Sequence, residues 1–200
     1  MAAGDRGRIN GVEGGMRIRF LSKNGHKIDE ARKILEPLGA EVIPINVAID
    51  EIQTRDVEAI VRDKVLRAFE RIGHRLFVEQ TCLYLDALNG FPGGLTQPFW
   101  DSLEADRFCD MFGNREKRGL TAKTWIGYCD GRRIHHFQGE IRGTVASAPR
   151  GDRAFQWDCV FVPDGHQQTF AEMGEGKNDI SMRRIALNAF ADHLRRRNDA

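Results

Sequence analysis

The alternation of apolar strands with amphipathic helices in the first half of the chain constrains its fold more than any other feature. Apolar spacing predicts a strand at residues 17–21, a helix at 27–38 and a strand at 41–47. A second amphipathic helix is expected at 56–72, and an apolar strand at 76–80 follows it. This order is typical of α/β domains in which parallel strands share one sheet.

The second half of the chain has a different pattern. A Pro-Gly-Gly loop at 92–94 and a helix near 99–112 end the strand–helix alternation. Two longer alternating segments, 121–129 and 133–146, then flank the turn formed by Asp130 and Gly131. Such a pair predicts an antiparallel hairpin.

The end of the chain completes the expected fold. A short strand at 159–162 leads through a polar loop to a last helix at about 181–196. We expect an α/β fold with a mixed, strongly twisted sheet, flanking helices, and two lobes with a cleft between them. Residues 1–15 lack an apolar period and are expected to form a flexible tail, leaving a single domain at 16–198.

Charge and cysteine usage exclude several classes of function. The 30 basic and 29 acidic residues give a formal charge of +1, so no broad basic surface for nucleic acid or membrane is expected. Apolar runs are too short for a membrane span. Cysteines without CxxC pairs or metal-ligand spacing predict reduced thiols in a cytoplasmic protein: Cys82, Cys109, Cys129 and Cys159.

A polar turn follows the first strand. Ser22, Asn24 and Lys27 stand where that strand meets the first helix, and free N–H groups at such a position favour a phosphate. The alternative is an ordinary helix cap with exposed lysines.

A second segment joins aromatic rings to charge. Phe155, Gln156, Trp157 and Asp158 are followed by Lys177 and by Ser181-Met182-Arg183. Aromatic rings can stack on a base, a carboxylate can accept from its ring N–H, and an arginine can donate to a 6-oxo group. The alternative for both rings is core packing at a strand end.

A third segment places polar groups at the end of a buried strand. Glu79, Gln80 and Thr81 follow Val78, and strand ends at an α/β cleft usually bind ligands. Glu51 could bring a second carboxylate, and two glutamates would suffice for Mg²⁺ on nucleotide phosphates. Glu51 could equally lie on a solvated loop.

In this order, the segments resemble the inosine triphosphate pyrophosphatase family from Arg17 to Leu194. The family's Thr/Ser-x-Asn-x-x-Lys is matched by Ser22, Asn24 and Lys27, its Glu-Asp-Thr-Gly-Leu by Glu79, Thr81 and Leu83, and its Leu-Pro-Gly by Phe91-Pro92-Gly93. Its Pro-Arg-Gly is matched by Pro149-Arg150-Gly151, its Phe-Gly-Tyr/Trp-Asp by Phe155, Trp157 and Asp158, its Phe-Ala-Glu-Met by 170–173, and its Lys and Ser-His-Arg by Lys177, Ser181 and Arg183.

The resemblance implies a magnesium-dependent homodimeric enzyme that cleaves ITP, dITP or XTP to the monophosphate and pyrophosphate. It assigns phosphates to Lys27, Lys64 and Lys177, the metal to Glu51, and the base to Phe155, Asp158 and Arg183, and Glu79 is a further candidate metal ligand. The remaining residues expected to contact the substrate are Ser22, Asn24, Thr81, Gln156, Trp157 and Met182.

Departures from the family fall on important positions. Gln80 replaces the aspartate expected to bind magnesium and activate water, and an amide cannot take a proton at neutral pH. Met182 replaces a histidine and Gln156 a glycine. Base and phosphate contacts are kept while the chemistry is damaged.

Two functions are compatible with this pattern. One is a catalytically impaired sensor of deaminated purine triphosphates that signals to an effector, such as a sirtuin-like NADase in bacterial antiviral defence. The other is a working pyrophosphatase in which Glu79 and Glu51 bind magnesium. Neighbouring strand residues point to opposite faces, so Glu79 cannot simply replace the missing aspartate.

Overall fold

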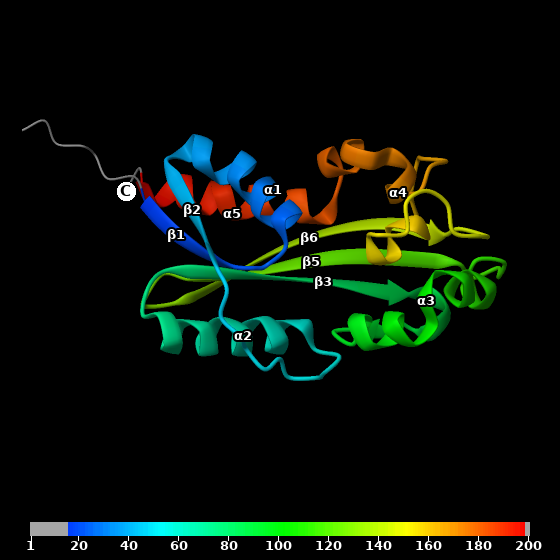
Figure 1. Ribbon diagram of the computed structural model, residues 1–200, viewed down its shortest axis with the longest axis horizontal. Coiled ribbons are helices and arrows are strands. Elements are labelled where there is room, and N and C mark those ends of the chain that lie inside the picture. The colour runs from blue at the N-terminus through cyan, green and yellow to red at the C-terminus, as the bar shows by residue number, and fades with distance from the viewer. Residues whose placement is uncertain (1–15, 199–200) are drawn as a thin grey trace, which may run out of the picture.

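The computed structural model describes residues 16–198, and within them a twisted mixed sheet carries helices on both faces (Figure 1). The flexible tail expected at 1–15 lies outside the described residues. The strands are β1 Met16–Leu21, β2 Ala40–Ile45, β3 Leu76–Leu85, β4 Pro92–Gly93, β5 Gly119–Cys129, β6 Ile134–Val145 and β7 Phe161–Pro163. The helices are α1 Gly25–Leu35, α2 Val57–Ile72, α3 Thr96–Phe112, α4 Phe170–Met173 and α5 Met182–Asn198.

The strand order is β2-β1-β3-β5-β6-β7, and β4 pairs with β3. The first three strands of the chain are parallel, with β1 between β2 and β3. From β3 onward the pairing is antiparallel, through the hairpin of β5 and β6 to the short β7. The expected mixed α/β sheet, with an α/β opening and a hairpin, is therefore confirmed.

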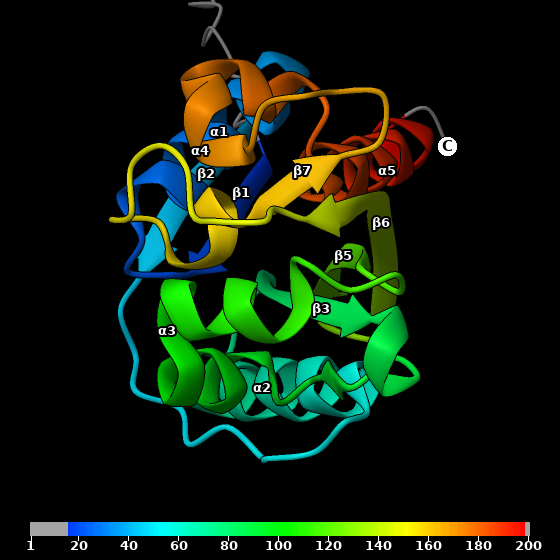
Figure 2. The same cartoon turned by 90° about the vertical axis from the view of Figure 1, so that its right-hand side faces the viewer.

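Helices α1, α4 and α5 cover one face of the sheet, and α2 and α3 lie against the other (Figures 1 and 2). The alternation along β3 explains how both faces are filled. Phe77 packs in the core with Phe190 of α5, whereas Val78 packs with Val61 and Val65 of α2. Alternate residues of this strand therefore face opposite halves of the molecule.

Local signals set the bounds of the two helices nearest the cleft. The side chain of Asn24 accepts a hydrogen bond from the backbone N–H of Lys27 at the start of α1, and Asp56 accepts one from Ala59 at the start of α2. Gly73, with a φ of 67°, ends α2 in the left-handed conformation that glycine adopts most easily.

Three expected elements differ in the structure. β3 does not end at Gln80 but continues to Leu85, because every residue from Leu76 to Leu85 pairs with β5. The strand expected at 159–162 is shifted to Phe161–Pro163, since Gln156–Cys159 forms a 3-10 turn. The expected polar loop contains α4, which begins at a capping box of Thr169 and Glu172.

Among the described residues, no helix combines the length and the apolar character that a membrane span needs.

Candidate functional site

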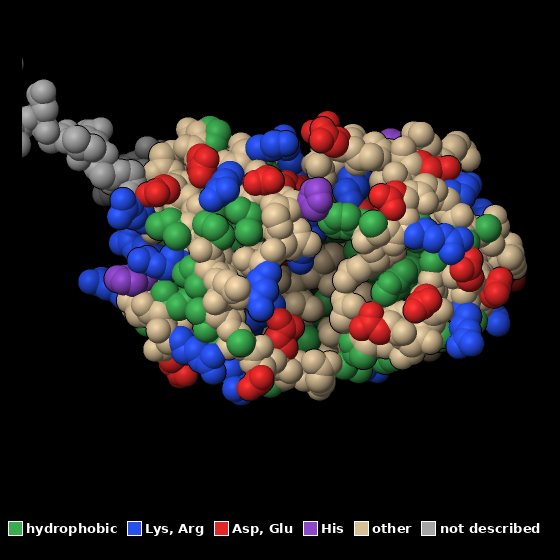
Figure 3. Space-filling view, in the orientation of Figure 1, with side chains coloured by type: hydrophobic (Ala, Val, Ile, Leu, Met, Phe, Trp, Pro, Cys, Tyr) green, Lys and Arg blue, Asp and Glu red, His purple; other side chains and the backbone are tan. Residues whose placement is uncertain are grey.

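A cavity of about 820 Å³ opens beside the middle of β3. Its walls come from the turn between β1 and α1, the linker after β2, the start of α3, and the segments around residues 154–158 and 177–183. Figure 3 shows a recess near the centre of one face, with basic and acidic side chains close to it. The cavity is lined by every site residue expected from the sequence: Ser22, Asn24, Lys27, Glu51, Lys64, Glu79, Gln80, Thr81, Phe155, Gln156, Trp157, Asp158, Lys177, Met182 and Arg183.

The turn between β1 and α1 presents the N-terminus of α1 to this cavity. The Ser22 hydroxyl accepts from the backbone N–H of Asn24 at 3.2 Å, and the Asn24 side chain accepts from that of Lys27 at 3.1 Å. The turn is thus an ordinary helix cap. Because it also lines the cavity, its free N–H groups are placed where a phosphate could bind.

Glu79 is the most strongly held carboxylate of the cavity. It is buried, accepts from the Thr81 hydroxyl at 2.5 Å, and has Lys27 Nζ at 3.0 Å and Arg183 Nε at 3.4 Å from Oε2. Burial alone would raise the pKa of Glu79, but the charges of Arg183 and Lys27 and the Thr81 hydroxyl together lower it to about 2. Glu79 is therefore ionised at neutral pH and paired with two basic side chains.

Arg183 is positioned by a residue that the sequence did not single out. Its Nη1 donates to Glu30 Oε2 at 3.1 Å, and the Ser181 hydroxyl donates to the other oxygen of Glu30 at 3.4 Å. Glu30 lies on α1 and is buried. An acidic residue on an amphipathic helix is usually exposed, so the only available signal was its spacing of three residues from Lys27 on the same helix face.

Phe155, Asp158 and Lys177 form a second cluster in the cavity. The ammonium of Lys177 donates to Asp158 and lies 4.2 Å from the centre of the Phe155 ring. His26 meets the same ring edge-on at 5.2 Å. Burial raises the pKa of Asp158, while Lys177 acts in the opposite direction.

Trp157 and Met182 line the cavity and also belong to the core. Trp157 is buried and packs against Phe161 and Phe170, and Met182 belongs to the same cluster. The core interpretation weighed for the aromatic pair therefore describes Trp157, whereas Phe155 is only half-buried.

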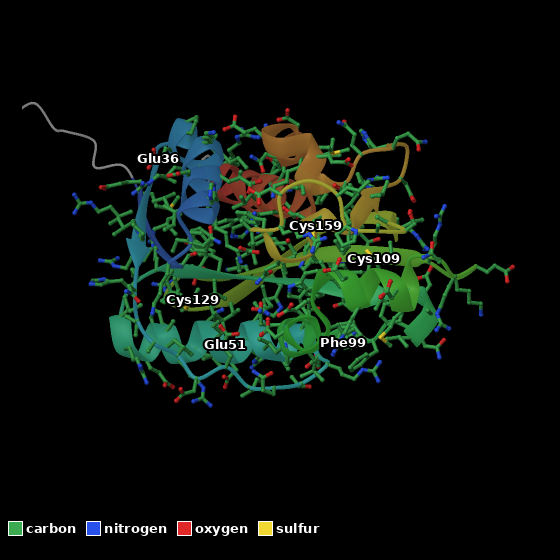
Figure 4. The ribbon with its side chains drawn as sticks, turned by 45° about the vertical axis from the view of Figure 1, so that its right-hand side comes forward. Glu36, Glu51, Phe99, Cys109, Cys129 and Cys159 are labelled. Carbon is green, nitrogen blue, oxygen red and sulfur yellow. The ribbon has the colours of Figure 1, made fainter. Side chains whose placement is uncertain are left out.

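Glu51 and Gln80 belong to the α2 side of the cavity. Glu51 Oε1 lies 2.5 Å from Nζ of Lys64, a residue of α2, and Figure 4 shows Glu51 against that helix. Gln80 alternates with Val78 and Cys82, which both pack in the α2 core, so its side chain faces α2. Glu79 faces the opposite half, as the alternation along a strand predicted.

Gln156 and Gln97 join two walls of the cavity. Gln156 Nε2 donates to Gln97 Oε1 at 2.7 Å, and Gln97 Nε2 donates to Asp101 at 2.7 Å. Gln156 has a φ of 37°, a left-handed conformation that side chains other than glycine adopt rarely. The sequence analysis did not identify Gln97. Its position depends on the start of α3, where the Thr96 hydroxyl accepts a hydrogen bond from the backbone N–H of Leu83.

Both carboxylates expected to hold Mg²⁺ are paired with basic side chains. Among the residues that the structure describes, no three His, Cys, Asp or Glu side chains are grouped so that they could hold a metal ion. Glu51 is paired with Lys64, and Glu79, on the other side of β3, is paired with Lys27 and Arg183. A magnesium ion usually takes one or two free carboxylates besides phosphates and water, and both candidates are already neutralised.

Comparison with known proteins gives consistent matches over the described part of the chain. The model of the Ham1 family matches residues 18–193. A dITP/XTP pyrophosphatase of Thermococcus kodakarensis is 35% identical over 181 residues, which cover 90% of this chain and 98% of that protein. An inosine triphosphate pyrophosphatase of Kluyveromyces lactis is 34% identical over 185 residues, covering 88% and 95%. The Ham1 protein of Staphylococcus aureus superposes with a TM-score of 0.75 at 22% identity, covering 89% of this chain and 97% of that one.

Proposed function

Because this chain belongs to the Ham1 family, we propose that its cleft binds a purine nucleoside triphosphate with a 6-oxo base, such as dITP, ITP or XTP, and leaves it largely intact. The observation that carries this proposal is Gln80, an amide on the face of β3 where the family resemblance places a catalytic aspartate. The surrounding residues are those of a nucleotide site, while the proton acceptor is missing.

Base recognition is supported by three side chains in one part of the cavity. Phe155 offers a ring face for stacking, which is worth roughly 1 to 3 kcal/mol per base. Asp158 can accept from the N–H of a 6-oxo purine ring, and Arg183 can donate to the 6-oxo group. The adenine base offers an acceptor at the ring nitrogen and a donor at position 6, so it meets the wrong partner at both positions.

Phosphate binding is supported by the end of α1 and by the lysines. The N-terminus of α1 lines the cavity with Lys27, and Lys64 reaches it from α2. Both ammonium groups are held by carboxylates at 3.0 and 2.5 Å, which fixes their position before a nucleotide enters. Lys177, paired with Asp158, supplies a further cation.

Slow hydrolysis follows from the chemistry of Gln80. An amide can neither accept a proton at neutral pH nor neutralise a cation, and loss of a general base costs roughly 10² to 10⁴ in rate. Glu79 does not take over, because it faces the opposite half of the cleft and its pKa of about 2 makes it a weak base.

A nucleotide that survives in its site can act as a signal. The proposal includes a cytoplasmic homodimer that binds a deaminated purine triphosphate and changes the state of an effector, for example a sirtuin-like NADase in antiviral defence. A sensor that rapidly destroyed its ligand would end its own signal, so recognition without fast hydrolysis suits this role.

The second candidate is an active pyrophosphatase. It is favoured by the names of the relatives, which are dITP/XTP or inosine triphosphate pyrophosphatases at 34–35% identity over most of both chains. In this case Glu51 and Glu79 would have to leave their lysine partners to bind magnesium and orient water.

Calorimetric titration with dITP, ITP, XTP, dGTP and dATP, followed by chromatography of each sample, separates the two candidates. Preferential binding of dITP, ITP or XTP over dATP, with the triphosphate recovered intact, supports the sensor, and the dGTP titration shows whether a 2-amino group on the 6-oxo base is tolerated. Conversion to the monophosphate at the rate of an ordinary pyrophosphatase refutes it. The variant Gln80→Asp is expected to hydrolyse dITP at least about 10²-fold faster than the unmodified protein, since it restores the general base.

A further inference from the structure

We propose that this cleft binds its nucleotide without a divalent metal ion, so that Mg²⁺ adds little to the affinity. The inference rests on the proposed function, because it concerns the same nucleotide in the same cavity. It differs from the magnesium dependence that the family resemblance implies, and it follows from how the charges of the cavity are paired.

The charged side chains that line the cavity favour an anion before any metal is present. Basic groups come from Lys23, Lys27, Lys64, Lys177 and Arg183, and carboxylates from Glu51, Glu79 and Asp158. Glu30, which holds Arg183 from α1, adds one more carboxylate. The cations still outnumber the carboxylates, so a bare triphosphate enters a site of opposite charge.

A metal ion would have to compete for its ligands. Glu51 is bound to Lys64 at 2.5 Å, and Glu79 is bound to Lys27 at 3.0 Å and to Arg183 at 3.4 Å. If Glu51 turned to a metal, it would leave Lys64, and if Glu79 did so, it would leave Lys27 and one side of Arg183. That exchange offsets most of what the new metal–carboxylate contact contributes.

The neutral side chain of Gln80 is the feature that removes the need for Mg²⁺. An aspartate at this position would add a second carboxylate on the α2 side of the cavity that Glu51 also lines, and it would repel a bare triphosphate. Magnesium would then be needed to bridge the carboxylates and the phosphates. The neutral amide removes that repulsion, and with it the reason for the ion.

The test compares nucleotide affinity with and without metal in matched variants. The α,β-methylene analogue of dITP, which cannot be cleaved at that linkage, is titrated in Mg²⁺ and in EDTA. For the unmodified protein we expect dissociation constants that agree within about threefold. Gln80→Asp is expected to bind at least about tenfold more weakly in EDTA than in Mg²⁺. Gln80→Asn, which has the size of aspartate without its charge, is expected to resemble the unmodified protein.

A second readout follows the metal itself. Mn²⁺ is added together with the analogue and followed by electron paramagnetic resonance. We expect the spectrum to show coordination of Mn²⁺ by the protein in Gln80→Asp, but not in the unmodified protein or in Gln80→Asn. Thermal unfolding of each variant shows whether it is folded.

Three outcomes overturn the inference. Binding by the unmodified protein only in Mg²⁺ refutes metal independence and leaves the proposed nucleotide function standing. Equal metal dependence of Gln80→Asp and Gln80→Asn shows that the charge at this position is not the cause. Absence of binding under both conditions refutes the inference and the proposed function together.

Discussion

The guanidinium of Arg183 lies 3.1 Å from the carboxylate of Glu30, so the last helix of the chain is joined to the first one beside the cleft. Glu30 is buried, the Arg183 side chain is 12% exposed, and Arg183 also contacts Glu79. Arg183 therefore reaches the cavity from a position set by Glu30 of α1, so a change at Glu30 should alter this part of the cavity wall.

Glu30→Gln removes the charge of this pair and keeps its shape. We expect a loss of about 1 to 3 kcal/mol in the free energy of unfolding, because Arg183, whose side chain is only 12% exposed, loses one of its two carboxylates. Urea denaturation measures it. The control is Asp29→Asn on the same helix, whose exposed contact with Arg32 spans 3.9 Å and should matter by less than about 0.5 kcal/mol. Equal losses in both variants would contradict the positioning role of Glu30.

Asp158→Asn tests recognition of the base. An amide can donate where the carboxylate only accepts, so the preference for dITP over dATP should fall by roughly 1 to 3 kcal/mol. The ratio of the two dissociation constants measures this preference. Asp164→Asn, an exposed change just beyond β7, serves as the control and should leave the ratio unaltered. An unchanged ratio in Asp158→Asn would remove Asp158 from base selection.

The pKa of Glu79 predicts how stability depends on pH. The folded protein holds this pKa at about 2, below the ordinary value of 4.5, so the carboxylate stabilises the fold above about pH 4.5. That contribution is lost as the pH falls from 4.5 towards 2. Denaturation at successive pH values should show a shallower acid decline for Glu79→Gln than for the unmodified protein. Glu41→Gln, in an exposed pair with Arg17, should leave the slope as it is.

The backbone of Gln156 gives a prediction about strain. Gln156→Ala loses the hydrogen bond to Gln97 and keeps the left-handed backbone, whereas Gln156→Gly loses the bond and relieves the strain. The glycine variant should therefore be more stable than the alanine variant by about 1 kcal/mol. Thermal unfolding of the two proteins decides this, and an alanine variant as stable as the glycine variant would show that the conformation carries no cost.

Periodic patterns predicted the elements of this fold because they depend on neighbouring residues. The α2 helix shows this, since its buried residues recur at helical spacing and Gly73 ends it. The predicted end of β3 at Gln80 was wrong, because β3 pairs with β5, which lies many residues later, and this pairing extends the strand to Leu85. Glu30 and Gln97 were missed for the same reason, since their partners Arg183 and Gln156 are distant in the sequence.

The alternation along β3 has a consequence for how such a protein can diverge from its relatives. One peptide bond separates Glu79, which holds Lys27 and Arg183, from Gln80, which faces α2. A substitution at Gln80 alone can therefore change the α2 side of the cleft while Glu79 keeps its contacts with Lys27 and Arg183. Under the proposed function, turnover can be lost by a change at Gln80 alone, so a receptor can descend from an enzyme without first losing its affinity.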